Sequence, residues 1–374
     1  MKNLIIILSL AFVGAGLASA QPFVRNNTGT PKIQIPDIPG YYTLKCDLHM
    51  HTVFSDGTVW PTVRVDEAVA EGLDAISITD HVELSHSTLK EYVKPDKVVG
   101  YEMAKIAVKG RPLIIIPGGE LSITKDHFNA LFITNQNDTV LSDKNPEIRI
   151  KAAFDQGGYV FWNHPGWYKA YKDGMAPKVQ SFYDMMKSGM IKGLEIANGD
   201  EYYEECFEIC EKYNLALLGN SDIHYISYYA YTPDDHRTIT LVFSPQKTAE
   251  GIHEALLNRR TLVYQGEHLI GRDEFLEPLF KSCLQIETKY SGTTSLAVMT
   301  ITNISDIGFY CENLGDLTFY NGTHFFALPA HSTTTLMVKT REILERFTLD
   351  LKVHNLIDGP RQSLKTTLAI EVLK

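Results

Sequence analysis

Asp47-Leu48-His49-Met50-His51, with Ser55-Asp56-Gly57 and Ile78-Thr79-Asp80-His81 soon after it, is the stretch from which the fold can be predicted. Side chains two positions apart lie on the same face of a β-strand, so His49 and His51 can reach one ion. A single His-x-His pair is a weak signal, since most histidines are surface residues or hydrogen-bonded core residues. Asp56 and His81 strengthen it, and the four residues together predict a metal site.

Further candidate ligands stand at or near the ends of strand-like apolar runs. They are Glu120, His127, His164, Asp222 and His224. The chain has 13 histidines, and surface histidines would not be expected to recur at such positions. The six imidazoles and three carboxylates of the full set suit Zn, Mn or Fe, whereas a set made only of oxygen ligands would indicate Ca or Mg.

Strand-length apolar runs alternate with helical patterns over residues 44–278. The expected strands are 44–51, 75–80, 113–117, 128–134, 159–163, 194–198, 215–220 and 238–243, and the expected helices include 61–72, 146–156, 179–188, 201–213 and 248–259. This alternation favours a parallel sheet, and the number of repeats favours an α/β barrel. A doubly wound open sheet is the alternative. So many polar residues at strand ends converge more easily on the carboxyl-end face of a closed barrel.

Residues 279–374 have a different sequence pattern, with alternating polar and apolar runs separated by Gly, Asn and Asp. This pattern predicts a small all-β sandwich. Its three histidines, His324, His331 and His354, stand among polar residues and are expected to be surface residues rather than ligands of a second metal site. The predicted organisation is therefore a signal peptide at 1–20, an extended lead-in at 21–43, the barrel at 44–278 and the sandwich at 279–374.

The first twenty residues have the features of a secretory signal peptide. Lys2 precedes an apolar run, and Ala18-Ser19-Ala20 forms a small-residue cleavage site before Gln21. An uncleaved membrane anchor is the alternative, but the apolar run is shorter than the roughly 20 residues that a spanning helix needs. The mature protein is therefore expected to be periplasmic or secreted, with no membrane attachment after cleavage.

Charge and cysteine content limit the classes of partner. The net charge of −10, without a basic cluster, argues against nucleic-acid binding, which depends on phosphate neutralisation by Lys and Arg. Five cysteines are too few for a disulfide scaffold, although a bridge between Cys283 and Cys311 remains open. A small anionic substrate suits this composition better than a polymer.

In this order, the motifs resemble those of the polymerase-and-histidinol-phosphatase (PHP) family of metal-dependent phosphoesterases. The matching motifs are Asp47-Leu48-His49-Met50-His51, Ser55-Asp56-Gly57, Ile78-Thr79-Asp80-His81, Gly118-Gly119-Glu120, Asn163-His164-Pro165 and Asn220-Ser221-Asp222-Ile223-His224. The resemblance covers roughly residues 44–265. Three further runs, 127–132, 236–243 and 270–272, resemble an exported subfamily of haloalkyl-phosphate diesterases, which also carries a β-rich C-terminal domain.

The resemblance implies a distorted (β/α)7 barrel with up to three divalent ions at its carboxyl-end face. It assigns His49, His51, Glu120 and Asp222 to one ion. Glu120 would bridge to a second ion held by His127 and His164, and Asp56, His81 and His224 would hold the third. The segment after His81, with Glu83, His86 and an insert at 92–100, departs from the family pattern and leaves substrate preference open.

Other polar residues near these motifs are candidates for supporting roles. Arg237 is expected to bind a nonbridging phosphate oxygen, with an ordinary surface ion pair as the alternative, and His236 is a weaker catalytic candidate. Asp47 is expected to accept a hydrogen bond from a ligand imidazole. Asp80 is expected either to do the same or to cap the following turn.

The predicted function is a phosphodiesterase that hydrolyses a small phosphate ester with metal-activated water. A phosphomonoesterase of the histidinol-phosphatase type is one alternative, which export and the C-terminal sandwich oppose. A noncatalytic module stabilised by metal is another, and its expected mark would be missing ligands. A nucleic-acid exonuclease is the third alternative, and the absence of a basic groove signature opposes it.

Overall fold

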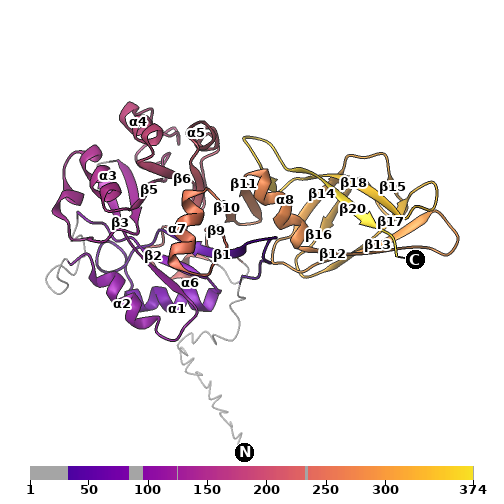
Figure 1. Ribbon diagram of the computed structural model, residues 1–374, viewed down its shortest axis with the longest axis horizontal. Coiled ribbons are helices and arrows are strands. Elements are labelled where there is room, and N and C mark those ends of the chain that lie inside the picture. The colour runs from indigo at the N-terminus through magenta and orange to yellow at the C-terminus, as the bar shows by residue number, and fades with distance from the viewer. Residues whose placement is uncertain (1–32, 84–95, 124, 232–234, 374) are drawn as a thin grey trace, which may run out of the picture. The chain divides into compact units, whose positions relative to one another are not determined.

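The computed structural model describes residues 33–83, 96–123, 125–231 and 235–373 (Figure 1). The predicted signal peptide, the first part of the lead-in, His86 and part of the 92–100 insert lie outside these ranges. Within them, no helix has the length and apolar character needed to cross a bilayer.

The first part of the chain is built on one curled 12-stranded sheet. Its strands are β1 (Tyr42–Asp47), β2 (Ala75–Ile78), β3 (Ile114–Ile123), β4 (Asp126–Leu131), β5 (Tyr159–Asn163), β6 (Ile191–Asn198), β7 (Glu201–Tyr202), β8 (Ala216–Asn220), β9 (Ile239–Ser244), β10 (Thr261–Gln265), β11 (His268–Gly271) and β19 (Leu356–Ile357). Their order is β19-β11-β10-β9-β1-β2-β3-β4-β5-β6-β7, and β8 pairs with β6.

Helices connect these strands, and Figure 1 shows α1 to α5 along the outer side of the curled sheet. They are α1 (Pro61–Glu71), α2 (Val99–Ala107), a 3-10 turn at Thr139–Ser142, α3 (Pro146–Asp155), α4 (Gln180–Ser188), α5 (Cys206–Tyr213), α6 (Ser227–Ala230), α7 (Ala249–Leu257) and α8 (Asp273–Ser282). The sequence sets α1 directly, because Pro61 opens its first turn and Gly72 ends it at φ 75°.

The sheet is a distorted barrel of the predicted α/β class. β1, β2 and β3 are parallel, as are β5, β6 and β8. The expectation of a wholly parallel sheet is wrong for β4 and β9, which run antiparallel to their neighbours. The segments after β1 and β8 meet, because Met50 forms a parallel bridge with Ile223 and the backbone N–H of His51 donates to the Ile223 carbonyl at 3.1 Å.

Strand β3 is longer than expected and carries Glu120 within the strand rather than after it. The expected strand ended at Pro117, but β3 continues through Gly118 and Gly119, against β2 and the residues that follow it. A Cβ on Gly118 would lie 2.4 Å from the Ser77 Oγ, and one on Gly119 would lie 2.7 Å from the Val82 Cγ1. From Gly118 onward β3 pairs with β4, so Glu120 lies in a hairpin instead of a loop.

The C-terminal part is an all-β sandwich, as predicted. Its strands are β12 (Leu284–Tyr290), β13 (Leu296–Asn303), β14 (Phe309–Asn313), β15 (Thr318–Phe319), β16 (Phe325–Leu328), β17 (Thr333–Lys339), β18 (Arg346–Val353) and β20 (Lys365–Glu371). They form two antiparallel sheets in the orders β12-β13-β17-β15 and β16-β14-β18-β20. Side chains alternate between buried and exposed along β18 and β20, the pattern of strands with one face on a core.

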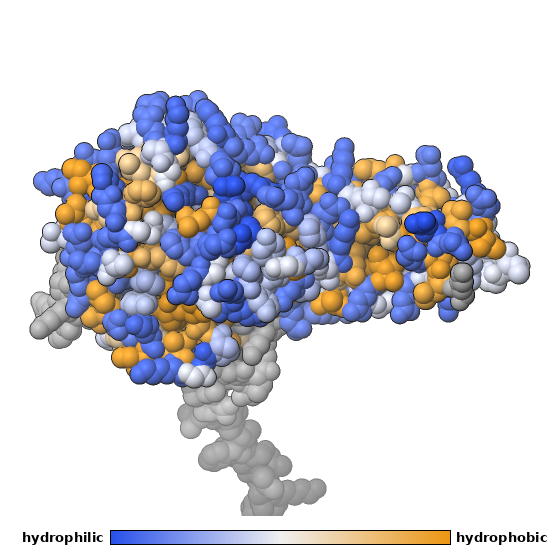
Figure 2. Space-filling view, in the orientation of Figure 1, coloured by the Kyte–Doolittle hydropathy of each residue, from blue (hydrophilic) through white to orange (hydrophobic). Residues whose placement is uncertain are grey.

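All five cysteines are buried free thiols, so the bridge left open between Cys283 and Cys311 does not form. Figure 2 shows hydrophilic residues over most of the face in view, with smaller hydrophobic groups between them. The exposed large hydrophobic residues include Tyr320, Phe325 and Ile343 of the sandwich.

Phe280 of α8 packs edge-on against Phe309 of β14 with ring centroids 4.9 Å apart, and both side chains are fully buried. We expect Phe280→Ala to lower the free energy of unfolding by about 3 to 5 kcal/mol, because it removes a buried ring and leaves a cavity. Urea unfolding measures this. Phe325→Ala, at a ring that is 62% exposed, is the matched control and should change stability by less than about 0.5 kcal/mol. Equal effects of the two substitutions would contradict the packing.

Candidate metal centre

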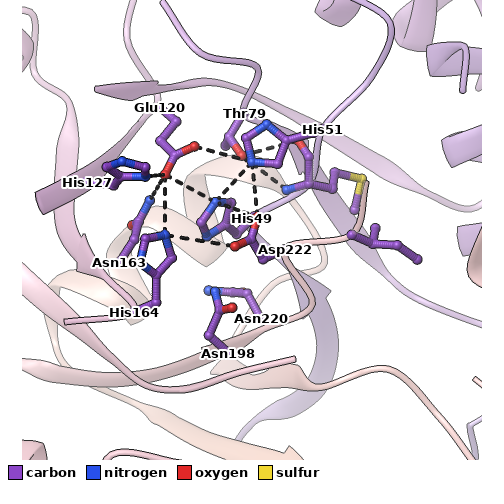
Figure 3. A network of polar contacts seen from close by, with 12 residues as sticks. His49, His51, Thr79, Glu120, His127, Asn163, His164, Asn198, Asn220 and Asp222 are labelled. Carbon is purple, nitrogen blue, oxygen red and sulfur yellow. Dashed lines mark hydrogen bonds and ion pairs between the residues drawn. The ribbon is translucent and has the colours of Figure 1, made fainter. Parts of the chain in front are cut away.

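The nine predicted ligands converge on one site at the carboxyl ends of the barrel strands. Eight of them line a cavity of about 620 Å³, namely His51, Asp56, His81, Glu120, His127, His164, Asp222 and His224. His49 is fully buried and contacts the same carboxylates. Figure 3 shows the side chains of His49, His51, Glu120, His127, His164 and Asp222 pointing toward one another.

Asp222 and Glu120 stand at the middle of the cluster. The Asp222 Oδ1 lies 3.2 Å from the His49 Nε2 and 3.1 Å from the His51 Nε2. The Glu120 Oε2 lies 3.2 Å from the His51 Nε2, and its Oε1 lies 3.0 Å from the His127 Nδ1. The position of Glu120 between two histidine groups is the one expected of a bridging carboxylate.

The other two expected groups also come together. The His164 Nε2 lies 3.7 Å from the Glu120 Oε1, on the side of His127. The Asp56 Oδ2 lies 3.4 Å from the His81 Nε2 and 3.3 Å from the His224 Nε2. Each expected ligand group is therefore assembled from residues distant in sequence.

The donor atoms fit divalent cations. Among the described residues, the Glu120 Oε2 and the Asp222 Oδ1 are buried side-chain oxygens that accept no hydrogen bond. Burying an anionic oxygen without a partner is costly, and a cation would satisfy both atoms. Several triplets of His, Asp and Glu around these oxygens have ligand atoms within 4.8 Å of one another. The mixture of imidazole and carboxylate ligands is that of a transition-metal site.

The electrostatics of the cluster favour positive charge. Burial lowers the pKa of His51, but hydrogen bonds and charges from Asp222 and Glu120 outweigh it and raise that pKa to about 10. Burial is likewise outweighed at Asp222, where His49 and His51 hold the pKa of the carboxyl well below its usual range. In the absence of metal, a proton on His51 offsets part of the negative charge of these carboxylates.

Two of the ligands have a strained backbone. His164 has φ 25° and Asp222 has φ 51°, values in the left-handed region that side-chain-bearing residues rarely adopt. Such strain persists only where surrounding contacts enforce it, and it concentrates at functional sites. Gly57 shows a related constraint, since a Cβ there would lie 2.6 Å from the backbone carbon of His51. A glycine is therefore required where the loop carrying Asp56 crosses the His51 segment.

Asp80 caps the turn rather than orienting an imidazole. Its Oδ1 accepts from the Thr52 backbone N–H at 2.7 Å and the Ser55 hydroxyl at 2.6 Å, and its Oδ2 accepts from the Thr52 hydroxyl at 2.6 Å. Neither expectation for Asp80 is confirmed, because the turn that it caps precedes Asp80 in the chain rather than following it. The turn it fixes connects His51 to Asp56.

Glu195 of β6 is a site residue that sequence reasoning missed. Its Oε1 accepts from the His49 Nδ1 at 2.9 Å, so the Nε2 of His49 faces the carboxylates of the cluster. Its Oε2 accepts from the backbone N–H of His164 at 2.9 Å and from the Asn198 amide at 2.9 Å. A carboxylate behind a ligand histidine fixes its tautomer and orientation. The available signal was a charged residue inside the apolar run of residues 191–197.

A register shift in β6 places Glu195 and Asn198 on the same side. The pairing with β8 shifts between Glu195 and Ala197, which is a β-bulge. In a regular strand, residues three apart would point to opposite faces. No local pattern in the sequence marks this bulge.

Arg237 does not line the cavity, and its expected contact with a phosphate oxygen is corrected. The side chain is fully buried. Its Nε and one terminal nitrogen donate to both oxygens of Glu71, at 2.6 and 2.9 Å, and the other terminal nitrogen donates to the Asp47 Oδ2 at 3.0 Å. Every nitrogen that could hold phosphate is thus engaged by a carboxylate, so Arg237 forms an ion pair, but a buried one rather than the surface ion pair of the alternative.

His236 and Asp47 also differ from expectation. The His236 Nδ1 and Nε2 face the backbone carbonyls of Arg237 and Gly266 at 2.7 and 3.0 Å, so neither nitrogen is available for catalysis. Asp47 accepts no imidazole hydrogen bond among the described residues. Its carboxylate instead accepts from the Ser221 hydroxyl at 2.5 Å, directly before Asp222 in the chain.

Arg64 is a second buried arginine that sequence reasoning missed. It donates to the backbone carbonyls of His51, Ile223 and Tyr225 at 3.0, 2.9 and 2.7 Å. These carbonyls belong to the two segments that carry His49, His51, Asp222 and His224. The available signal was an arginine on the apolar face of α1, where the buried residues are Pro61, Arg64, Val65 and Ala68.

Comparison with known proteins gives two domain matches. Residues 47–222 match the PHP domain family, and residues 284–369 match an Ig-like domain family. The crystal structure of a two-domain protein from Bacteroides vulgatus, described as containing a predicted PHP-like metal-dependent phosphoesterase, is similar over nearly its whole length. It shares 35% identity with a TM-score of 0.83, and the match covers 91% of this chain and 98% of that one.

A curated relative matches a smaller region. A 5'-3' exoribonuclease of Haemophilus influenzae is 34% identical over 80 residues, which is 21% of this chain. The match spans only 24% of the length of that relative.

The buried position of Arg237 leads to a stability prediction. We expect Arg237→Met to lower the free energy of unfolding by about 3 to 5 kcal/mol, because it leaves the carboxylates of Asp47 and Glu71 buried without their partner. Urea unfolding of the metal-free protein measures this. Arg111→Met removes an exposed ion pair with Asp66 and should cost at most about 1 kcal/mol. Unchanged stability together with a raised KM in Arg237→Met would restore the phosphate-binding role.

The raised pKa of His51 leads to a pH prediction. Because its folded-state pKa of about 10 exceeds the ordinary 6.5, its protonation stabilises the metal-free fold fully below pH 6.5, and this contribution is lost as pH rises through 10. Metal binding must displace this proton, so Mn²⁺ affinity should rise with pH across the same window. Calorimetry at pH 7.5 in two buffers of different ionisation enthalpy should show proton release. Binding without proton release would contradict the prediction that His51 is protonated in the metal-free protein.

Proposed function

This chain belongs to the PHP-like metal-dependent phosphoesterases, and we propose that it is a phosphodiesterase acting on a small soluble ester. The observation that carries the proposal is the convergence of nine ligand residues around one cavity, with two buried carboxylate oxygens that face the imidazole nitrogens of other ligands. Divalent cations bound there would supply an activated water and would offset negative charge on the phosphoryl oxygens. A metal-stabilised module without catalysis would not need an open cavity beside the ligands.

Two walls of the cavity support a diester rather than a monoester. The tryptophan wall consists of Trp167 and Lys169, and the Trp167 ring lies 5.4 Å from His164 and 5.9 Å from His127 between centroids. The tyrosine wall consists of Tyr225, Tyr231 and Asp200. Tyr225 directly follows His224, whose ring stacks on His51 at 4.3 Å.

The two walls adjoin different ligands, because Trp167 packs near His127 and His164 whereas Tyr225 directly follows His224 in the chain. Figure 3 shows His127 and His164 close together and His51 apart from them. A phosphodiester centred on the cluster has one substituent for each wall, whereas a monoester would leave one wall without a contact. This arrangement favours the diesterase over the monoesterase.

We assign to Lys169 the role that the sequence predicted for Arg237, that of the cation that attracts the substrate. It is the one lysine among the described residues that line the cavity, and none of these residues is an arginine. Its ammonium lies 5.4 Å from the Trp167 ring centroid and makes no ion pair with another described residue. An unpaired ammonium beside the reaction centre is suited to a nonbridging phosphate oxygen.

A small substrate outside the cytoplasm completes the proposal. The cavity volume of about 620 Å³ is in the range of pockets that bind small molecules. The net charge of −10 opposes a nucleic-acid polymer as substrate. The proposed location rests on the signal-peptide pattern of residues 1–20.

Hydrolysis of bis-p-nitrophenyl phosphate and p-nitrophenyl phosphate before and after chelation tests this function. We expect the diester to have the higher kcat/KM, activity to disappear on chelation and to return with Mn²⁺ or Zn²⁺, and Asp222→Asn to remove it. Lys169→Met should raise KM for the diester by about threefold to tenfold, because it removes one charge–charge contact.

Lys172→Met is the matched control for Lys169, since Lys172 lies in the same loop but does not line the cavity. Turnover of neither ester by protein with full metal occupancy would refute the phosphoesterase. Faster turnover of the monoester would replace the diesterase by a phosphomonoesterase.

A further inference from the structure

Charged side chains of opposite sign, Lys169 and Asp200, line the cavity. Lys169 places a positive charge on the tryptophan wall, beside His127 and His164. Asp200 places a negative charge on the tyrosine wall. A substrate complementary to both walls has its negative phosphoryl group at the metal centre and a positive group toward Asp200.

The carboxylate of Asp200 is exposed and free of protein partners. It forms no hydrogen bond or ion pair with another residue of the described ranges, although it faces a cavity in a folded region. Asp200 and Tyr231 line the same cavity, and Asp200 is one of several carboxylates whose charge adds to burial in raising the pKa of Tyr231. The anion is thus available to a ligand at the surface of an aromatic ring.

The turn that presents Asp200 is held rigidly. The carbonyl of the preceding Gly199 accepts from the Thr238 hydroxyl at 2.6 Å and from the Gln265 amide at 2.7 Å. The Gly199 N–H donates to the Asn220 carbonyl at 2.9 Å, two residues before Asp222 in the chain. The position of Asp200 is therefore fixed relative to the metal centre.

The tyrosines opposite this turn are also fixed. Ser227, at the start of α6, donates through its backbone N–H to Glu67 at 2.7 Å and through its hydroxyl to Glu71 at 2.8 Å. Arg64 holds the Tyr225 carbonyl. The Tyr225 ring itself is 63% exposed, so its face is accessible from the cavity. Two aromatic faces and a carboxylate form the combination that binds organic ammonium groups.

We propose that the tyrosine wall binds the non-reacting alcohol of the substrate and that this alcohol carries a fixed positive charge, as choline and other amino alcohols do. This inference rests on the proposed phosphodiesterase function. The substrate is then a zwitterionic phosphodiester. Its ammonium group contacts Tyr225, Tyr231 and Asp200, while its phosphoryl group lies at the metal centre near Lys169.

Three diesters with the same leaving group test this inference on the metal-loaded protein. They are p-nitrophenyl phosphorylcholine, methyl p-nitrophenyl phosphate and thymidine 5'-p-nitrophenyl phosphate. Because p-nitrophenolate leaves from each, differences in kcat/KM report recognition of the other alcohol. We expect kcat/KM for the choline ester to exceed that for the methyl ester by about tenfold or more. Both Asp200→Asn and Tyr225→Leu should bring this ratio toward one.

Tyr229→Leu is the matched control. Tyr229 lies in the same short helix as Ser227 and is 78% exposed, but it does not line the cavity. Its substitution should leave the choline-to-methyl ratio unchanged. Calorimetric binding of choline phosphate and methyl phosphate adds a readout that needs no turnover, and the wild-type protein should bind choline phosphate more tightly.

The outcomes separate this inference from the proposed function. Preferential binding of choline phosphate without turnover of any diester would support the tyrosine wall and refute the phosphodiesterase. Turnover with equal ratios for the choline and methyl esters would refute the cationic alcohol and leave the phosphodiesterase standing. A preference for the thymidine ester, or an unchanged ratio in Asp200→Asn, would also overturn the proposal.

Discussion

The metal centre depends on two buried arginines that hold together the segments after β1 and β8. Arg64 binds the carbonyls of both segments, and Arg237 joins Asp47, at the end of β1, to Glu71, at the end of α1. Asp47 in turn holds Ser221 beside Asp222. Removing any one charge from such a network leaves another buried without a partner, which costs several kcal/mol. The network therefore fixes the backbone that carries His49, His51, Asp222 and His224.

A rigid backbone matters here because the ligands are held close together before any cation binds. Three carboxylates and six histidines lie around one cavity, and two carboxylate oxygens have no hydrogen-bond donor among the described residues. The strained φ values of His164 and Asp222 are maintained by the same surroundings, through Glu195 at His164 and through Asp47 and Ser221 at Asp222. Folding thus supplies the free energy that is needed to bring the ligands together. The tyrosine wall is attached to the same framework, because Glu71 binds both Arg237 and Ser227 of α6.

The positions of many helices and strands follow from local sequence. Pro61 and Gly72 set the ends of α1, and fully apolar runs such as Tyr159–Asn163 give buried strands. The ligands could be identified because imidazole and carboxylate side chains recur at strand ends in a recognisable order. The antiparallel strands β4 and β9 were not expected, since apolar periodicity carries no information about strand direction. The extension of β3 through Gly118 and Gly119 was missed because the glycines allow a close approach to residues of another strand.

The amino-acid sequence by itself determined the α/β barrel, the C-terminal sandwich and the identity of the residues that come together at the metal centre. The ligand chemistry of these residues is a property of their side chains, and the residues recur along the sequence at the spacing of the strands. Only the tertiary structure decided the roles of the charged residues around them. Arg237 became a buried partner of Asp47 and Glu71, while Lys169 and Asp200 both came to line the cavity. The physical reason is that the role of a charge depends on its burial and its partners, and those partners come from distant parts of the chain.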